Sequence, residues 1–96
     1  MNPRTKGPVT KQAILVIQNR LGLHARPAAL FVQMANRFKS EIGVRKGKEK
    51  VNGKSIMGIM TLAAGRGTQI TIQATGPDAA EAISSLTKLI RSSFGE

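Results

Sequence analysis

The chain has 96 residues, with 15 Lys and Arg against 5 Asp and Glu and a formal net charge of +10, so one domain with a single modest core is expected. It has no cysteine, which excludes disulfide bonds and thiolate metal sites and suits a reducing compartment. The apolar run 13–17 is too short for a membrane span or a secretory signal, so we expect a cytoplasmic protein without membrane insertion.

The first eleven residues differ in composition from the rest of the chain. Basic residues alternate there with turn-forming ones: Arg4, Lys6 and Lys11 stand among Pro3, Gly7 and Pro8. This composition is typical of a flexible leader. We therefore expect a basic leader over residues 1–11 and a folded domain over residues 12–96.

The first strand and the first helix are expected on either side of a turn around Gly22. The continuous, β-branched run 13–17 predicts a strand that is buried on at least one face. From His24 onward, apolar residues recur with helical spacing, at Ala28, Phe31, Val32, Ala35 and Phe38. Pro27 fits such a helix, because the N–H that proline lacks would have no intrahelical partner in the first turn.

A hairpin is expected next. Ile42 and Val44 alternate with polar neighbours, and a turn over 46–48 would bring Val51 back as the second arm. Ser55 is then placed to cap a short helix over about 56–62, and the glycines at 65 and 67 would end it.

A fourth strand and a last helix complete the predicted order. Residues 69–74 alternate strictly between polar and apolar, which is typical of a strand with one apolar face. Asp78 and Glu81 resemble an acidic capping box at the head of a helix. The apolar stripe of that helix comprises Ala82, Ile83, Leu86, Leu89, Ile90 and Phe94. The order β-α-β-β-α-β-α, with one apolar face per element, predicts a two-layer α+β sandwich.

His24 stands where the turn becomes the first helix. The unpaired N–H groups of a helix's first turn, together with the positive end of its dipole, stabilise an anion such as a phosphorylated imidazole. The same environment favours the neutral imidazole, whose lone pair can attack phosphorus. Arg26 adds a guanidinium within reach of phosphate oxygens. From the residues alone, however, a helix-start histidine beside a solvated arginine is an equally good interpretation.

Two segments resemble the signatures of one family. Residues 22–28, Gly-Leu-His-Ala-Arg-Pro-Ala, are similar to the active-site signature of the HPr family, the histidine-containing phosphocarriers of the bacterial phosphotransferase system, including its nitrogen-related branch. Residues 52–58, Asn-Gly-Lys-Ser-Ile-Met-Gly, resemble the family's second signature. The resemblance covers about residues 13–96 and implies an open-faced sandwich, with a four-stranded antiparallel sheet covered on one face by three helices.

The resemblance also implies a function. His24 would accept, on Nδ1, a phosphoryl group that enzyme I takes from phosphoenolpyruvate, and IIA-type proteins or domains would receive it. Arg26 would be the electrostatic partner of His24. Such a protein is a phosphoryl carrier in a chain of transfers rather than an enzyme, and we expect neither a cofactor nor a metal.

The second signature raises two further expectations. Ser55 is by itself a common helix N-cap, but the resemblance implies regulatory phosphorylation by an ATP-dependent HPr kinase/phosphorylase where the organism has one. The resemblance also implies a partner-binding patch around His24. Its members are apolar, and the methionines among them can adapt to several partners: Ala29, Leu30, Ile56, Met57 and Met60.

Two other functions remain open from the sequence. A basic nucleic-acid-binding module is suggested by the cluster of Arg45, Lys46, Lys48, Lys50 and Lys54, although the absence of Tyr and Trp disfavours base stacking. A protein of the same fold could also act mainly as a regulator, through the phosphorylation state of His24 or Ser55. A nucleotide-binding P-loop around 53–55 is excluded, because residue 48 is Lys where that motif requires Gly.

Overall fold

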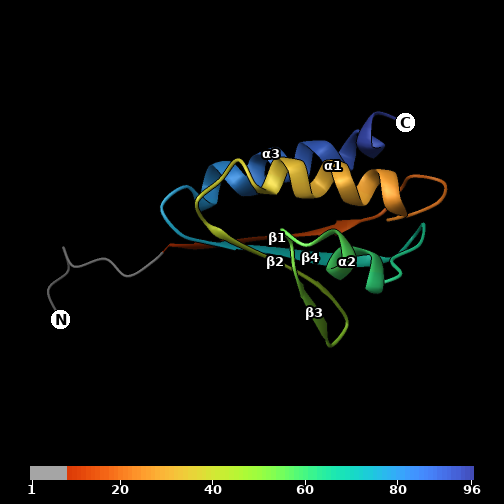
Figure 1. The fold of residues 1–96 in the computed structure, drawn as a ribbon, viewed down its shortest axis with the longest axis horizontal. Coiled ribbons are helices and arrows are strands. Elements are labelled where there is room, and N and C mark those ends of the chain that lie inside the picture. The colour runs from red at the N-terminus through yellow and green to blue at the C-terminus, as the bar shows by residue number, and fades with distance from the viewer. Residues whose placement is uncertain (1–8) are drawn as a thin grey trace, which may run out of the picture.

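The structure is a computed structural model, and it describes residues 9–96. Within that range the elements follow one another as β1 (Thr10–Val16), α1 (Ala25–Ala35), β2 (Glu41–Lys46), β3 (Glu49–Asn52), α2 (Ile56–Thr61), β4 (Gln69–Thr75) and α3 (Ala79–Arg91), with a 3₁₀ turn at Ser93–Gly95 (Figure 1). The predicted order β-α-β-β-α-β-α is confirmed.

The sheet of the described residues has four strands in the order β1-β4-β2-β3, and every neighbouring pair is antiparallel. Alternate rows of paired residues therefore face opposite sides of the sheet. One row is apolar and runs across all four strands as Ala13, Ile72, Val44 and Val51. The next row has the opposite orientation and is mostly polar: Ile14, Thr71, Arg45 and Lys50. The core therefore lies on one face of the sheet only.

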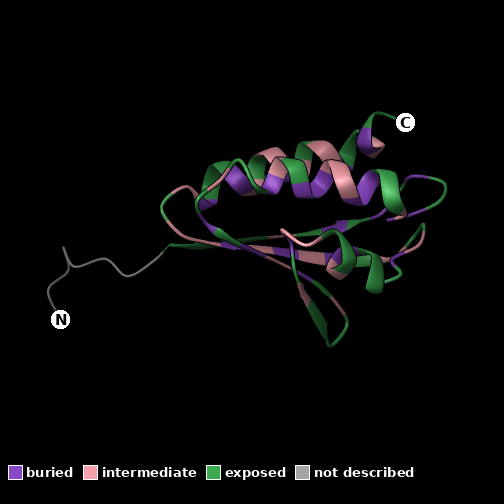
Figure 2. Cartoon of the chain, viewed as in Figure 1, coloured by how far each residue is buried: buried purple, intermediate pink, exposed green. Residues whose placement is uncertain are grey.

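Helices cover that apolar face. Helices α1 and α3 lie side by side along the sheet, and their buried residues face it, while the opposite sheet face is half-buried or exposed (Figures 1 and 2). Helix α2 packs against α1. The largest fully buried side chains come from every layer: Phe31, Ile17, Ile59, Leu62, Ile70, Ile72, Leu86 and Ile90. The predicted open-faced α+β sandwich is confirmed.

Three predicted boundaries need correction. Strand β1 begins at Thr10, inside the predicted leader, because Thr10 pairs with Thr75 and the two hydroxyls lie 3.1 Å apart. Residues 1–8 of that leader lie outside the described residues. Helix α1 ends at Ala35, so Phe38 packs against the core from the following turn. Helix α2 ends before the glycines proposed to stop it, since Ala63 already has a positive φ of 50°.

The expected capping box at the head of α3 is wrong. Asp78 is the N-cap residue, but its side chain makes no capping hydrogen bond. Its carboxylate instead accepts hydrogen bonds from the backbone N–H groups of Lys39 and Ser40, both 2.9 Å, and from the Ser40 hydroxyl at 2.6 Å. The hydroxyl bond, followed by the Lys39 amide, lowers the pKa of Asp78 to about 2. Asp78 thus ties the α1–β2 turn to the start of α3.

This contact predicts a pH-dependent loss of stability on replacing Asp78 with Asn. Because the folded-state pKa of about 2 lies below the ordinary value of 3.8, the carboxylate stabilises the fold above about pH 4, and this contribution disappears as the pH falls towards 2. We expect Asp78→Asn to melt below the wild type at pH 7, and the two melting temperatures to converge between about pH 4 and 2. Thermal melts by circular dichroism measure this. Glu81→Gln, an exposed acid on the same helix, is the control, and a gap that stays constant with pH would contradict the assignment.

Candidate functional site

The loop before α1 is held rigidly against the loop after α2. The buried side-chain amide of Asn19 donates to the Gly22 carbonyl at 2.6 Å, and the Gly22 N–H donates to the Asn19 carbonyl at 3.1 Å. Gly22 has a φ of 68°, and any side chain there would overlap the backbone of Ala64. The Leu23 N–H donates to the Ala64 carbonyl at 2.9 Å. The backbone is therefore fixed immediately before His24.

His24 is the N-cap residue of α1, and its side chain is not used for capping. Its carbonyl accepts from the Ala28 N–H at 2.9 Å, which starts the helix, while Pro27 has no N–H to satisfy. Within residues 9–96, no hydrogen bond reaches the N–H groups of Ala25 and Arg26, and no acidic residue occupies the first turn. The first turn of α1 therefore offers free N–H groups and no acidic side chain of its own beside the imidazole, an arrangement that favours an anion.

The imidazole meets a carboxylate that the sequence did not point to. His24 Nε2 lies 3.4 Å from Glu96 Oε2, and the His24 side chain keeps 36% of its surface exposed. Glu96 reaches this position because the chain reverses after α3, where Ser93, Phe94 and Gly95 all have positive φ angles. Phe94 is buried, as predicted, but it lies beyond the end of α3 rather than on its apolar stripe, and its burial anchors this reversal. The start of α1 and the C-terminal segment accordingly lie at the same end of the molecule (Figure 1).

Arg26 lies two residues after His24, in the first turn of α1. Its side chain is exposed, and it makes no ion pair or hydrogen bond within residues 9–96. The structure therefore places Arg26 and His24 on one helix turn without a direct contact between them. A guanidinium in this position remains available to phosphate oxygens.

A shallow hollow of about 250 Å³ adjoins the imidazole. It is lined, together with His24, by Leu21, Leu23, Met60, Ala63, Ala64 and Gly65. Of the predicted partner-binding residues, Met60 lines this hollow and is 42% exposed, and Ile56 and Met57 on the same helix are 43% and 77% exposed. Ala29 and Leu30 are half-buried, and Leu30 packs against the core.

Leu21 was missed in the sequence. It is 70% exposed and lines the hollow that contains His24. The available signal was a large apolar residue between Arg20 and Gly22 in a predicted turn, where a buried role is unusual.

Ser55 caps α2, as predicted. Its Oγ accepts a hydrogen bond from the Gly58 N–H at 3.0 Å, and the residue is half-buried. The same helix carries the exposed Met57, so any charge added to Ser55 would lie close to the apolar surface beside His24.

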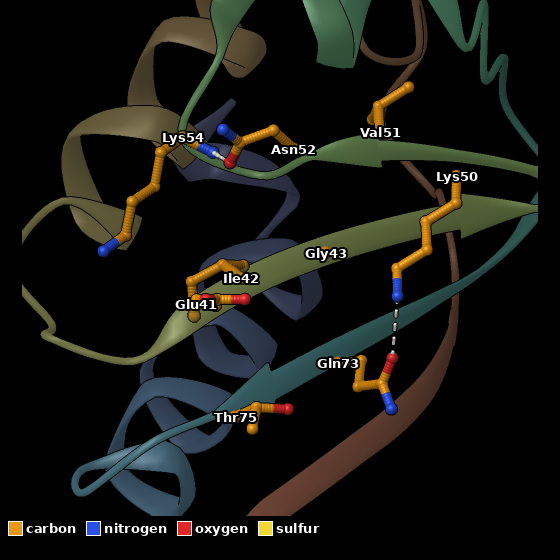
Figure 3. A pocket seen from close by; sticks show the side chains of 9 residues that line it. All are labelled: Glu41, Ile42, Gly43, Lys50, Val51, Asn52, Lys54, Gln73 and Thr75. Atoms are coloured by element: carbon orange, nitrogen blue, oxygen red, sulfur yellow. Dashed lines mark hydrogen bonds between the residues drawn. The ribbon is translucent and has the colours of Figure 1, made fainter.

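A larger hollow lies elsewhere, on the sheet face that the helices leave open. It has a volume of about 490 Å³ and is lined by Glu41, Ile42, Gly43, Lys50, Val51, Asn52, Lys54, Gln73 and Thr75 (Figure 3). Lys50 extends across Gly43 and donates to the Gln73 side chain at 3.2 Å. The lining offers no histidine, so the chemistry of phosphoryl transfer points to the smaller hollow at His24.

The basic cluster around the hairpin is largely used inside the protein. Lys46 Nζ donates to the Leu62 carbonyl at 2.9 Å, Lys54 Nζ donates to the Phe38 carbonyl at 2.7 Å, and Lys50 is bonded to Gln73. Arg45 and Lys48 make no hydrogen bond or ion pair within residues 9–96. The alternative of a nucleic-acid-binding module therefore gains no support.

No helix among the described residues is both long and apolar enough to span a membrane. Residues 9–96 also contain no group of three or more His, Cys, Asp or Glu side chains that could hold a metal ion.

Known proteins resemble this chain over most of its length. The family model described as "PTS HPr component phosphorylation site" matches residues 11–92. The phosphocarrier protein HPr of Neisseria meningitidis is 55% identical over 86 residues, which cover 90% of this chain and 96% of the relative. The HPr-like protein Crh of Bacillus subtilis is 49% identical over 75 residues, or 78% of this chain and 88% of that protein. A crystal structure of HPr from Thermoanaerobacter tengcongensis superposes with a TM-score of 0.87 at 53% identity, covering 90% of this chain and 97% of the other. The chain therefore belongs to the HPr family, the phosphocarriers of the phosphotransferase system.

Proposed function

We propose that this protein accepts a phosphoryl group on His24 from enzyme I and passes it to IIA-type proteins or domains. The observation that carries the proposal is a partly exposed imidazole at the uncapped start of α1, with no acidic residue in that first turn. An acceptor must be reachable by two different proteins in turn, and this ring lies beside a shallow hollow rather than inside a deep one.

The contact with Glu96 supports Nδ1 as the attacking atom. A carboxylate opposite Nε2 favours the tautomer that carries its proton on Nε2, and the lone pair then resides on Nδ1. Nδ1 attacks the phosphorus, so that a nitrogen–phosphorus bond forms here while the bond between the phosphorus and the donor atom of enzyme I breaks. In the second transfer, the acceptor atom of the IIA protein attacks the phosphorus, and the bond between Nδ1 and the phosphorus breaks.

The remaining contribution to the transfer is mainly stabilisation of the negative charge on the phosphoryl oxygens. Loose phosphoryl transition states need positioning and neutralisation of the transferring oxygens more than covalent help. The N–H groups of Ala25 and Arg26 supply fixed donors, and the Arg26 guanidinium supplies a movable charge. The protein itself is regenerated only by passing the group on, so it works as a carrier and not as an enzyme. No cofactor enters this scheme, and we assign the activity to the cytoplasm.

Docking of both partners is assigned to the apolar surface around His24. It combines the predicted residues Ala29, Leu30, Ile56, Met57 and Met60 with Leu21. Phosphorylation of Ser55 by an HPr kinase/phosphorylase would place negative charge beside this surface and weaken docking, although the N-terminus of α2 itself tolerates an anion.

Replacing His24 with Ala tests the acceptor. Incubation with phosphoenolpyruvate and enzyme I should give the wild type an acid-labile, base-stable phosphoryl adduct and give His24→Ala none. Nitrogen-15 and phosphorus-31 NMR of the labelled imidazole should place the phosphorus on Nδ1. Equal labelling of the alanine variant would show that another residue is the acceptor.

Replacing Arg26 with Gln should slow the transfer and leave the fold intact, because the side chain is exposed and contributes only charge and hydrogen bonds to the moving group. A charge-assisted hydrogen bond contributes about 1.5–3 kcal/mol, so the rate should fall about tenfold to a hundredfold. Rapid-quench kinetics with enzyme I measure the rate. Arg45→Gln removes an equal charge from the open sheet face and should transfer at the wild-type rate. Equal rates for the two variants would argue against the role of Arg26.

Replacing Ser55 with Asp should weaken docking more than chemistry. The added charge lies on the helix that carries Ile56 and Met57, so the KM for enzyme I should rise severalfold while kcat changes little. Ser84→Asp adds the same charge to an exposed position of α3 and serves as the control. A KM equal to that of the control would separate Ser55 from the docking surface.

A further inference from the structure

Lys46 makes a contact that the phosphocarrier function does not by itself explain. It is the last residue of β2, it is half-buried, and it lies in a different element from both signature segments. Its Nζ donates to the Leu62 carbonyl at 2.9 Å and lies 3.5 Å from the Ala63 carbonyl. Helix α2 has no basic residue in its own last turn. Lys46 therefore supplies the positive charge that the carbonyl end of a helix favours, and it does so from the neighbouring strand.

The segment that Lys46 holds is under backbone strain. Ala63 has a φ of 50°, a left-handed conformation that residues with a Cβ adopt only at an energetic cost. Glycine is the usual residue at this position after a helix, and the first glycine of this chain beyond α2 is Gly65. A strained alanine persists when its surroundings fix it from outside. The Lys46 ammonium group, on the carbonyl of the preceding Leu62 and on that of Ala63 itself, is one such constraint.

The same segment forms the wall against which His24 is placed. The Ala64 carbonyl accepts the Leu23 N–H at 2.9 Å, and Gly22 packs directly against Ala64 and Gly65. Ala63, Ala64 and Gly65 line the hollow that contains His24. The hydrogen bond of Leu23 therefore transmits the position of the α2–β4 loop to the residue immediately before the imidazole.

We infer that Lys46 is a positioning residue for His24, acting through the Leu62 and Ala63 carbonyls and the Ala64–Leu23 hydrogen bond. The inference rests on the proposed role of His24 and adds a residue that touches neither the imidazole nor the phosphoryl group. It also separates Lys46 from the other cations of the hairpin, since Lys48, two residues away, is exposed and makes no hydrogen bond or ion pair within residues 9–96.

The test compares Lys46→Gln with Lys46→Arg, using Lys48→Gln as the matched control for the loss of one hairpin charge. The two readouts are the kcat and KM of phosphorylation by enzyme I and the hydrogen-exchange rate of the Leu23 amide by NMR. For Lys46→Gln we expect kcat to fall about threefold to tenfold with a smaller change in KM, and the Leu23 amide to exchange faster by at least that factor. Lys46→Arg keeps the charge and should recover most of both losses. Lys48→Gln should match the wild type.

Global destabilisation has a different signature. The amide of Ile72, in the centre of the sheet, would then exchange faster by the same factor as that of Leu23, and Lys46 would be merely structural. If Lys46→Gln does not fold, Ala63→Gly in its background allows the comparison against Ala63→Gly alone, because glycine adopts a φ of 50° without strain.

The remaining outcomes are distinct. Wild-type kcat in Lys46→Gln overturns the inference, whether or not the Leu23 amide changes. A slower transfer with unchanged Leu23 exchange also overturns it, because the route through Ala64 would then be wrong. Failure of the wild type to be labelled on His24 overturns the proposed function instead, and the Leu23 measurement would still report whether Lys46 holds the loop.

Discussion

The structure depends on one constraint: the backbone at His24 is fixed by hydrogen bonds, while its imidazole is not used to cap the helix. The residue's carbonyl starts α1 by accepting from Ala28, and the preceding Leu23 is hydrogen-bonded to Ala64. The ring takes no part in capping. Within residues 9–96, its one ion-pair contact is with the carboxylate of Glu96. As the proposed nucleophile, a ring held in this way would lose little orientational freedom on meeting a phosphoryl donor, and it would need no enclosed pocket to be positioned.

The sandwich leaves apolar side chains exposed at the end of the molecule where His24 lies. Helices α1 and α3 bury their apolar stripes against the sheet, whereas the short α2 cannot bury every side and leaves Met57 and Met60 exposed, with Met60 in the hollow of the imidazole. Leu21 adds a third apolar side chain from the loop before α1. A carrier must release each partner after transfer, so a small patch of adaptable side chains suits it better than a large complementary interface.

Local patterns predicted the elements and failed where distant segments meet. Alternation over 69–74 and the stripe from Ala28 to Ala35 gave β4 and α1 because each pattern lies within one element. The carboxylate of Asp78 was misassigned to a cap, since its true partners at Lys39 and Ser40 belong to another turn. Glu96 was missed for the same reason, because the left-handed backbone at Ser93 and Phe94 that returns it to His24 has no propensity signal. The signature residues indicated the site, but they could not reveal its tertiary supports.

The cations behind the net charge of +10 lie in different parts of the molecule and have different roles. Coulomb interactions between exposed groups are screened beyond about 8–10 Å at moderate ionic strength. Arg45 and Lys48 belong to the hairpin, which points away from α1, so screening leaves their charges little influence on the imidazole (Figure 1). Lys54 is bonded to the Phe38 carbonyl and contributes to the fold, whereas Lys46 is bonded to the Leu62 carbonyl in the segment inferred to position His24. Arg26 is the cation on the first turn of α1, where the proposed function uses its charge on the transferring phosphoryl group. The overall basicity and the chemistry at His24 are therefore largely separate properties of this chain.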